Sequence, residues 1–210
     1  MKCVIVGAGT YGQVYYSYLK RNGVKIAGFL DDNPSLHGTE ILGEKVLGGT
    51  EMLSSKSADF DAVYAPIGNN KDRVKILSQA RECGYQTPCF FHESAVISED
   101  AKFADGIYVL AGSVIMPFAE FEDFAMVSMS VNVAHHSLLK TGAFLSTGVN
   151  FGASIVAEDF AYVGIGATIV TKVKRLGKNC LVGAGAVVVN DVPDNAVVAG
   201  VPAKVIKYRQ

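Results

Sequence analysis

The sequence predicts two domains of different architecture, an α/β nucleotide-binding half domain followed by a parallel β-helix. Two patterns carry this prediction. A glycine motif with the spacing GxGxxG, Gly7 to Gly12, follows a short apolar segment at the start of the chain. Further along, an aliphatic or aromatic residue recurs at every sixth position from Ile97 to Ile169, with one lapse. Side chains on one face of a helix recur about every 3.6 residues, and those on one face of a strand about every 2. A period of six indicates a β-helix instead, in which each hexad forms one flat face of a coil.

The first ninety or so residues have the pattern of one α/β unit. Strand-like segments and helical patterns alternate along it, at residues 2–6, 13–21, 25–30, 61–67 and 72–83. We expect residues 87–91 to close this unit as its last strand, so that the domains are 1–91 and 92–210. Loops at the carboxyl ends of parallel strands bind ligands in such units.

The glycine motif predicts a phosphate-binding turn, because backbone N–H groups can approach a phosphate at the start of a helix. Together with an acidic residue about twenty positions later, here Asp31 or Asp32, it resembles an NAD fingerprint. A dinucleotide site usually needs two such halves, and this chain changes to hexads after one. A nucleotide sugar or another mononucleotide therefore fits better. A nicotinamide oxidoreductase, and a tight turn without a ligand, remain open as alternatives.

The hexads predict which side chains face into the coil. Their first positions are Ile97, Phe103, Val109, Ile115, Phe121, Val127, Val133, Leu139, Leu145, Phe151, Ala157, Val163 and Ile169. The pattern then slips by one residue and resumes at Leu176, Val182 and Val188. The fifth position of each hexad is small or aliphatic, and we expect it to face inward as well. Cys180 occupies such a position and should lie in the core.

His135 and His136 are the candidate catalytic residues. They occupy the third and fourth positions of the hexad that begins at Val133, so both should face away from the core. A neutral imidazole suits a general base near neutral pH. Zinc needs at least three protein ligands, and no third histidine is near in the sequence, so we expect no metal unless a neighbouring subunit supplies a ligand. We interpret His37 and His92 as structural or incidental.

The composition excludes several classes of protein. The chain has 210 residues, a net charge of -1 and a hydrophobic fraction of 50%. The small net charge argues against general binding of nucleic acid or membrane surfaces, and no apolar run approaches the roughly 18 residues that span a bilayer. The first residues lead directly into a strand, so we expect no signal peptide. Four cysteines without metal-type spacing indicate reduced thiols, and we expect a cytoplasmic protein.

Taken together, these features resemble the NeuD/PglD-type sugar acyltransferases, a family of hexapeptide-repeat acetyltransferases with an added nucleotide-sugar domain. The resemblance covers essentially the whole chain. It rests on the glycine motif, the hexads and three short segments, Leu30–Asp32, Ile67–Asn70 and Gly200–Lys204. It implies a left-handed β-helix, a homotrimer with active sites between subunits, and acetyl-CoA as the acyl donor. Acetyl-CoA would be a co-substrate rather than a permanently bound cofactor.

The resemblance also implies roles for individual residues. His135 matches the catalytic base. The residue after the base is usually acidic in the family and is His136 here, and Phe144 stands where a second histidine near the acetyl carbonyl is often found. The residues that match nucleotide-sugar contacts are Gly9, Thr10, Tyr11, Asp31, Asp32 and Gly68. The residues assigned to acetyl-CoA are Phe144, Gly164, Ile165, Gly183, Ala184 and Lys204.

The predicted function is acetyl-CoA-dependent N-acetylation of a nucleotide-linked amino-dideoxy sugar in bacterial surface glycan biosynthesis. Transfer would be direct, with His135 as the general base. An O-acetyltransferase that acts on a sialic-acid-type sugar is the first alternative, because it shares the chemistry and differs only in the acceptor. A γ-carbonic-anhydrase-like or purely structural β-helix protein is a further alternative.

Overall fold

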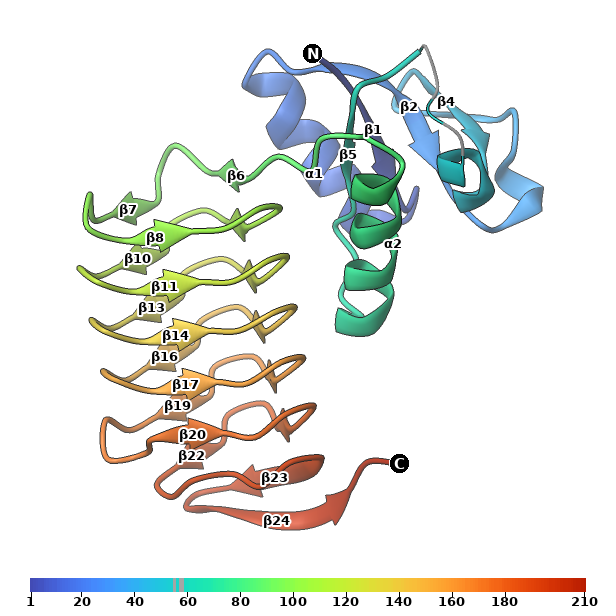
Figure 1. Ribbon diagram of the computed structural model, residues 1–210. Coiled ribbons are helices and arrows are strands. Elements are labelled where there is room, and N and C mark those ends of the chain that lie inside the picture. The colour runs from blue at the N-terminus through green and yellow to red at the C-terminus, as the bar shows by residue number, and fades with distance from the viewer. Residues whose placement is uncertain (55, 57–58) are drawn as a thin grey trace. The chain divides into compact units, whose positions relative to one another are not determined.

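The computed structural model describes all residues except 55 and 57–58, and it divides the chain into two compact units, Met1–Pro88 and Cys89–Gln210 (Figure 1). The division falls three residues before the predicted boundary at residue 91. We refer to the two units as the N-terminal domain and the coil domain.

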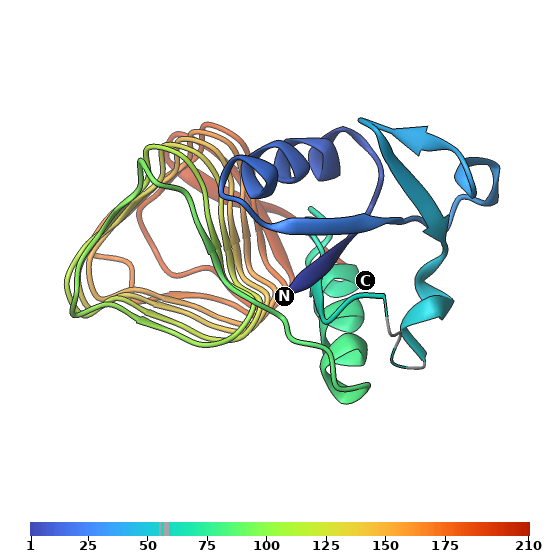
Figure 2. The ribbon, with the colours of Figure 1, turned by 90° about the horizontal axis from the view of Figure 1, so that it is seen from above.

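The N-terminal domain is built on a five-stranded sheet in the order β3-β4-β2-β1-β5, with helices α1 and α2 on either side of the sheet (Figure 2). The neighbours pair in parallel, apart from the antiparallel pair β3 and β4. The elements are β1 Lys2–Val6, α1 Thr10–Arg21, β2 Lys25–Leu30, η1 Pro34–Leu36, β3 Glu40–Ile41, β4 Glu44–Gly48, η2 Thr50–Ser54, β5 Ala62–Tyr64 and α2 Asn70–Glu82.

The predicted strands 2–6 and 25–30 are confirmed as β1 and β2, and both predicted helices are confirmed with slightly earlier starts. The hairpin β3–β4 was not predicted. Its two-residue turn places Leu42 at φ 53° and Gly43 at φ 83°. A turn with two positive φ angles suits a tight hairpin, and such turns usually have Asn-Gly, Asp-Gly or Gly-Gly at these positions. Leucine stands at the first position here, so the usual sequence pattern for this turn is absent.

The coil domain is a stack of short strands in three parallel sheets, and Figure 2 looks down its axis. Each strand pairs with strands one coil above and below, so that Val133 lies beside Ile115 and Phe151, 18 residues away on either side. The two-residue strands are β6 Phe90–Phe91, β7 Val96–Ile97, β8 Lys102–Phe103, β9 Tyr108–Val109, β10 Val114–Ile115, β11 Glu120–Phe121, β12 Met126–Val127, β13 Asn132–Val133, β14 Leu138–Leu139, β15 Phe144–Leu145, β16 Asn150–Phe151, β17 Val156–Ala157, β18 Tyr162–Val163, β19 Thr168–Ile169, β20 Arg175–Leu176, β21 Leu181–Val182 and β22 Val187–Val188. The antiparallel pair β23 Ala196–Gly200 and β24 Ala203–Tyr208 closes the stack.

Most of the core of the coil domain consists of the residues that the hexads predicted. From Val109 to Val188 every first-position side chain is buried, and Cys180 is fully buried as expected. Two inward serines are satisfied by backbone carbonyls, since the Ser113 hydroxyl donates to Ser128 O at 2.7 Å and the Ser137 hydroxyl to Gly152 O at 2.9 Å. The predicted fold class, a Rossmann-like half domain followed by a β-helix of hexapeptide repeats, is confirmed.

The assignment of residues 87–91 to the N-terminal sheet was wrong. Phe90 and Phe91 form β6, which pairs in parallel with β9 in the coil domain. Gln86 makes only an isolated bridge with Ala62 at the edge of β5. The signal was present in the sequence, because Phe91 lies six residues before Ile97 and continues the hexad series by one step.

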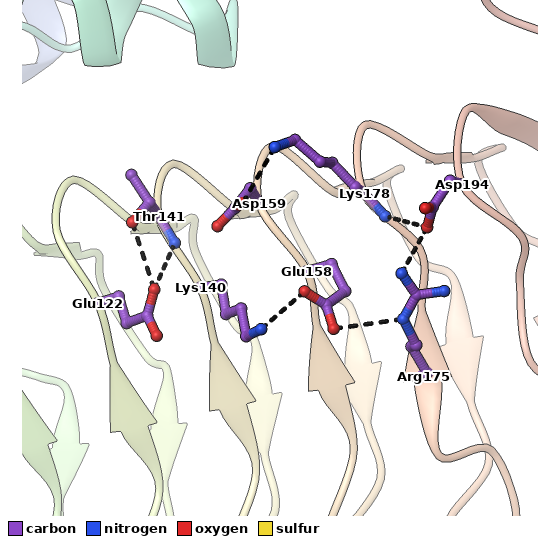
Figure 3. A network of polar contacts seen from close by, with 8 residues as sticks. All are labelled: Glu122, Lys140, Thr141, Glu158, Asp159, Arg175, Lys178 and Asp194. Atoms are coloured by element: carbon purple, nitrogen blue, oxygen red, sulfur yellow. Dashed lines mark hydrogen bonds and ion pairs between the residues drawn. The ribbon is translucent and has the colours of Figure 1, made fainter.

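A column of ion pairs runs along one corner of the coil domain (Figure 3). Glu158 accepts from Lys140 Nζ at 2.8 Å and from Arg175 Nε at 3.2 Å, and Arg175 also pairs with Asp194. Each partner comes from a different coil, so the column links successive coils through their side chains in addition to the backbone ladder.

Candidate functional site

The glycine motif forms a tight turn between β1 and α1. A Cβ atom on Gly12 would lie 1.8 Å from the carbonyl oxygen of Gly7, so only glycine fits there. Gly9 is the N-cap of α1 and offers no side-chain cap, and nothing lies within 4 Å of the position where its Cβ would be. The space beside Gly9 at the start of α1 is therefore open, and a helix N-terminus is a place that favours a phosphate.

Asp31 and Asp32 lie beside this turn, as predicted. One carboxylate oxygen of Asp31 accepts the N–H of Ala8 at 2.9 Å, and the other accepts the N–H of Asn33 at 2.9 Å. Asp32 accepts the N–H of Thr50 at 2.7 Å, and this hydrogen bond lowers the pKa of the Asp32 carboxyl. The fold therefore holds Asp32 as an anion at the end of β2.

The other predicted nucleotide-sugar residues lie at the same edge of the sheet. Thr10 is exposed and Tyr11 is half-buried in the first turn of α1. Gly68 is exposed and follows β5, with nothing within 4 Å of the position of an added Cβ. His37 was not among the predicted site residues, but its Nε2 lies 2.8 Å from the carbonyl oxygen of Asp31.

His135 and His136 lie at the corner between β13 and β14, and both side chains are exposed, as the hexads predicted. Their Nδ1 atoms are 3.0 Å apart and their rings meet edge to face. Only one nitrogen of an Nδ1–Nδ1 pair can carry the shared proton, so one imidazole donates and the other accepts. If His135 donates, its Nε2 keeps a lone pair and can act as a base.

The corner fixes the orientation of His136. Its backbone has φ 57°, and its N–H bonds to the carbonyl oxygen of Pro117 at 3.3 Å. Phe118 occupies the equivalent corner one coil away, and its ring centroid lies 4.8 Å from that of His136. Phe118 is 49% exposed, so an apolar surface borders the histidine pair.

A groove of about 380 Å³ follows the outer face of the sheet that contains β13. Along it the Asn132 amide donates to Asn150 Oδ1 at 2.9 Å. The groove reaches Ala134, the residue before His135, and Gly152 in the next coil. A long thin ligand could lie here with its end near the exposed imidazole.

Most of the residues assigned to acetyl-CoA lie at a different corner of the coil domain. Gly164 and Ile165 follow β18, and Gly183 and Ala184 follow β21 one coil below. A Cβ on Gly164 would lie 2.7 Å from the backbone nitrogen of Ala184, so glycine permits the close stacking of these two coils. Ile165 is 60% exposed.

The remaining two assigned residues lie on strands. Phe144 is in β15, where its ring is buried and meets Tyr162 edge to face, with centroids 5.2 Å apart. Lys204 is an exposed residue of β24. Within one chain, the structure therefore does not bring the histidine pair and the residues assigned to acetyl-CoA to one corner.

The described part of the chain, residues 1–54, 56 and 59–210, contains neither a candidate metal site nor a helix that could span a membrane. No group of three or more His, Cys, Asp or Glu side chains there is arranged to hold a metal ion. None of the helices in those residues has the length and apolar character required to span a membrane.

Comparison with known proteins gives similarity over both domains. The model of the PglD N-terminal domain family matches residues 2–80. A GDP-perosamine N-acetyl transferase from Caulobacter crescentus, solved as a histidine-to-alanine variant with CoA and GDP-perosamine, is 28% identical with a TM-score of 0.92, over 99% of this chain and 97% of that one. The acetyltransferase domain of PglB from Neisseria gonorrhoeae, solved with acetyl coenzyme A, is 29% identical with a TM-score of 0.88, over 98% of each chain.

A curated relative matches over a shorter stretch. Over 53 residues the chain is 53% identical to a 2,3,4,5-tetrahydropyridine-2,6-dicarboxylate N-acetyltransferase of Staphylococcus aureus, and this stretch is 25% of this chain and 22% of that enzyme. The match thus spans about a fifth of the relative's length.

Proposed function

The predicted resemblance to the NeuD/PglD-type sugar acyltransferases is confirmed, and on that premise we propose that this chain transfers an acetyl group from acetyl-CoA to the amine of a nucleotide-linked amino-dideoxy sugar. The observation that carries the proposal is the exposed pair of His135 and His136 at a corner of the coil. The open turn at Gly9 beside Asp31 supports the nucleotide-sugar part.

The mechanism we propose is direct transfer. The acceptor nitrogen attacks the thioester carbonyl, the C–S bond breaks, and CoA leaves as the thiol. His135 Nε2 removes the proton from the acceptor nitrogen and returns it to the departing sulfur. His136 holds His135 in the required tautomer through the 3.0 Å Nδ1–Nδ1 contact. Holding both substrates in line supplies much of the rate.

The placement of the site residues supports a homotrimer. The histidine pair and the proposed acetyl-CoA residues, such as Ile165, lie at different corners of one coil domain. A complete site then needs His135 from one subunit and the acetyl-CoA corner of its neighbour. Mixing subunits tests this, because His135→Ala and Ile165→Glu trimers should each be inactive and should regain activity after exchange into mixed trimers. Mixed trimers that stay inactive would contradict a shared site.

The choice of an amine acceptor rests on the similar enzymes. The Caulobacter crescentus relative is a GDP-perosamine N-acetyl transferase in complex with CoA and GDP-perosamine. A hydroxyl acceptor, as in a sialic-acid O-acetyltransferase, has no observation in its favour here. We also propose a cytoplasmic location, where acetyl-CoA and nucleotide sugars are available, and a role in bacterial surface glycan biosynthesis.

The test is release of free CoA thiol from acetyl-CoA in the presence of UDP-, GDP- and dTDP-linked 3- and 4-amino-dideoxy sugars. CoA release with one of these sugars, with an N-acetylated product by mass spectrometry, is the expected result. Silence across the panel with CoA still bound would favour a hydroxyl acceptor. Failure to bind CoA at all would overturn the acetyltransferase proposal.

A further inference from the structure

Phe118 contacts the histidine pair from a neighbouring coil, although it was not among the predicted site residues. It lies at the corner after β10, as His136 lies at the corner after β13, and 18 residues separate the two. Their backbones have nearly the same conformation, with φ 62° at Phe118 and φ 57° at His136. The two side chains therefore lie side by side, with ring centroids 4.8 Å apart and an interplanar angle of 45°.

Packing within the coil gives little reason for a phenylalanine at position 118. A positive φ suits glycine and is costly for a bulky side chain, and Gly112 and Gly142 have the same conformation at other corners. Phe124 shares it too, but its side chain is 1% exposed, so burial compensates there. The side chain of Phe118 is 49% exposed. An exposed phenylalanine in this conformation beside the candidate base indicates a role at the site.

The proposed reaction creates a positive charge at this corner. When Nε2 of His135 takes the proton of the acceptor amine, the ring of His135 becomes an imidazolium. In the tautomer that leaves Nε2 free, the Nδ1–H of His135 is donated to Nδ1 of His136, 3.0 Å away. Because both groups are imidazoles, that proton can pass between them without an intrinsic difference in proton affinity. The charge can therefore move to His136.

The adjoining corners offer this charge an aromatic ring rather than a carboxylate. Residues 116–119 form the corner in one neighbouring coil and residues 152–155 the corner in the other, and neither segment contains Asp or Glu. A cation is attracted to an aromatic ring when it lies within about 6 Å of the ring centroid. The ring of His136 lies within this distance of Phe118.

We propose that Phe118 is a further positioning residue for acetyl transfer, whose aromatic face orients His136 and stabilises the positive charge that passes to it from His135. The inference rests on the proposed function. The Nδ1 proton of His135 moves to Nδ1 of His136 as Nε2 takes up the proton of the acceptor amine. It returns as Nε2 gives that proton to the departing sulfur, so the pair ends in its starting state. His136 and Phe118 together thus replace the acidic residue that usually follows the base in the family.

The first experiment is the steady-state rate of CoA release by full-length Phe118→Leu, with the amino-sugar nucleotide that wild type acetylates. Leucine keeps an apolar side chain and removes the ring face. Loss of a cation–π contact at an exposed site should lower kcat by roughly two- to fivefold, with the KM for the nucleotide sugar unchanged. Phe160→Leu is the matched control, because Phe160 has φ 59° at the corner between β17 and β18, away from the histidines. Its kcat should equal that of wild type.

Two further measurements separate the charge from packing. Fluorinated phenylalanines at position 118 keep the shape of the ring and withdraw electron density from its face. The kcat should therefore fall stepwise with the number of fluorine atoms. His136→Glu places a fixed negative charge beside His135, so Phe118→Leu should cause no further loss of kcat in that background. The double-mutant cycle measures this coupling directly.

A kcat that does not change across the fluorinated series, or an equal loss from Phe118→Leu with and without His136→Glu, would overturn the proposal. A higher KM for the nucleotide sugar with an unchanged kcat would also overturn it, because Phe118 would then act by binding the sugar. If wild type acetylates the sugar and Phe118→Leu does so at the same rate, this proposal fails and the proposed function stands. If no sugar supports CoA release, the proposed function fails and this proposal with it.

Discussion

Replacing Glu158 with glutamine should destabilise the coil domain at neutral pH, because one carboxylate serves two cations from neighbouring coils. Glu158 lies 2.8 Å from Lys140 Nζ and 3.2 Å from Arg175 Nε, and its side chain is only 19% exposed (Figure 3). Glutamine keeps the shape of the side chain and removes its charge. The variant therefore isolates the electrostatic contribution of the column.

Two partly shielded pairs set the magnitude of this effect. Exposed ion pairs contribute roughly 0.2–1 kcal/mol each, so the loss of both should cost about 1 kcal/mol. For a chain of this size that lowers the melting temperature by roughly 2–4 °C. Thermal unfolding followed by circular dichroism in the strand region is the assay.

The pH dependence provides a second readout. Hydrogen bonds and charge from Lys140 and Arg175 lower the pKa of Glu158 from its ordinary value of 4.5. A carboxyl with a lowered folded-state pKa stabilises the fold above its unfolded pKa and loses that contribution as the pH falls through the folded value. The difference between wild type and Glu158→Gln should therefore be full at pH 7 and shrink below about pH 4.5.

Glu120→Gln is the matched control for the column. Glu120 forms an ion pair with Lys102, and both side chains are well exposed, at 49% for Glu120 and 75% for Lys102. Its replacement should leave the melting temperature unchanged within error. A loss in Glu120→Gln equal to that in Glu158→Gln, or a Glu158→Gln effect that does not diminish as the pH falls below 4.5, would refute the reasoning.

Three further predictions follow from other parts of the molecule. Gly12→Ala should destabilise the N-terminal domain by about 2–3 kcal/mol, because the added Cβ would lie 1.8 Å from Gly7 O. Calorimetry should then detect no nucleotide binding. Near-normal stability of the variant would contradict the close approach of Gly12 to Gly7. Cys3 and Cys180 should resist alkylation at pH 8 until the protein unfolds, since burial raises the pKa of each thiol to about 12; labelling of the native protein at either cysteine, detected by mass spectrometry, would contradict this. In steady-state assays His136→Ala should lower kcat less than His135→Ala does. His136→Gln keeps a hydrogen-bonding group and should have a higher kcat than His136→Ala. Equal kcat values in the two His136 variants would contradict the proposal that His136 positions His135.

The coil domain was predictable almost residue by residue, because its geometry repeats at a fixed step. Val133 and Phe151 are buried in equivalent positions three hexads apart, and the sequence shows that equivalence directly. The same step placed His135 and His136 on the outside. Phe91 lies six residues before Ile97 and belongs to the same series, so the coil domain begins one step earlier than predicted.

Contacts between distant residues could not be predicted in this way. A cleft of about 240 Å³ in the N-terminal domain is lined by both Asp32 and Lys75 of α2, and nothing in the spacing of the two residues indicates that they line one cavity. The Nδ1–Nδ1 contact of the histidine pair depends on the positive φ of His136 and on its packing against Phe118. Such features depend on local backbone geometry rather than on periodicity.

The most direct test of the central claim is the rate of CoA release from acetyl-CoA with saturating nucleotide-linked amino sugar, measured for wild type and His135→Ala. The account predicts that wild type acetylates the amine and that His135→Ala loses roughly 10²–10⁴ in kcat while CoA still binds. A His135→Ala variant that acetylates the sugar at the wild-type rate would contradict it.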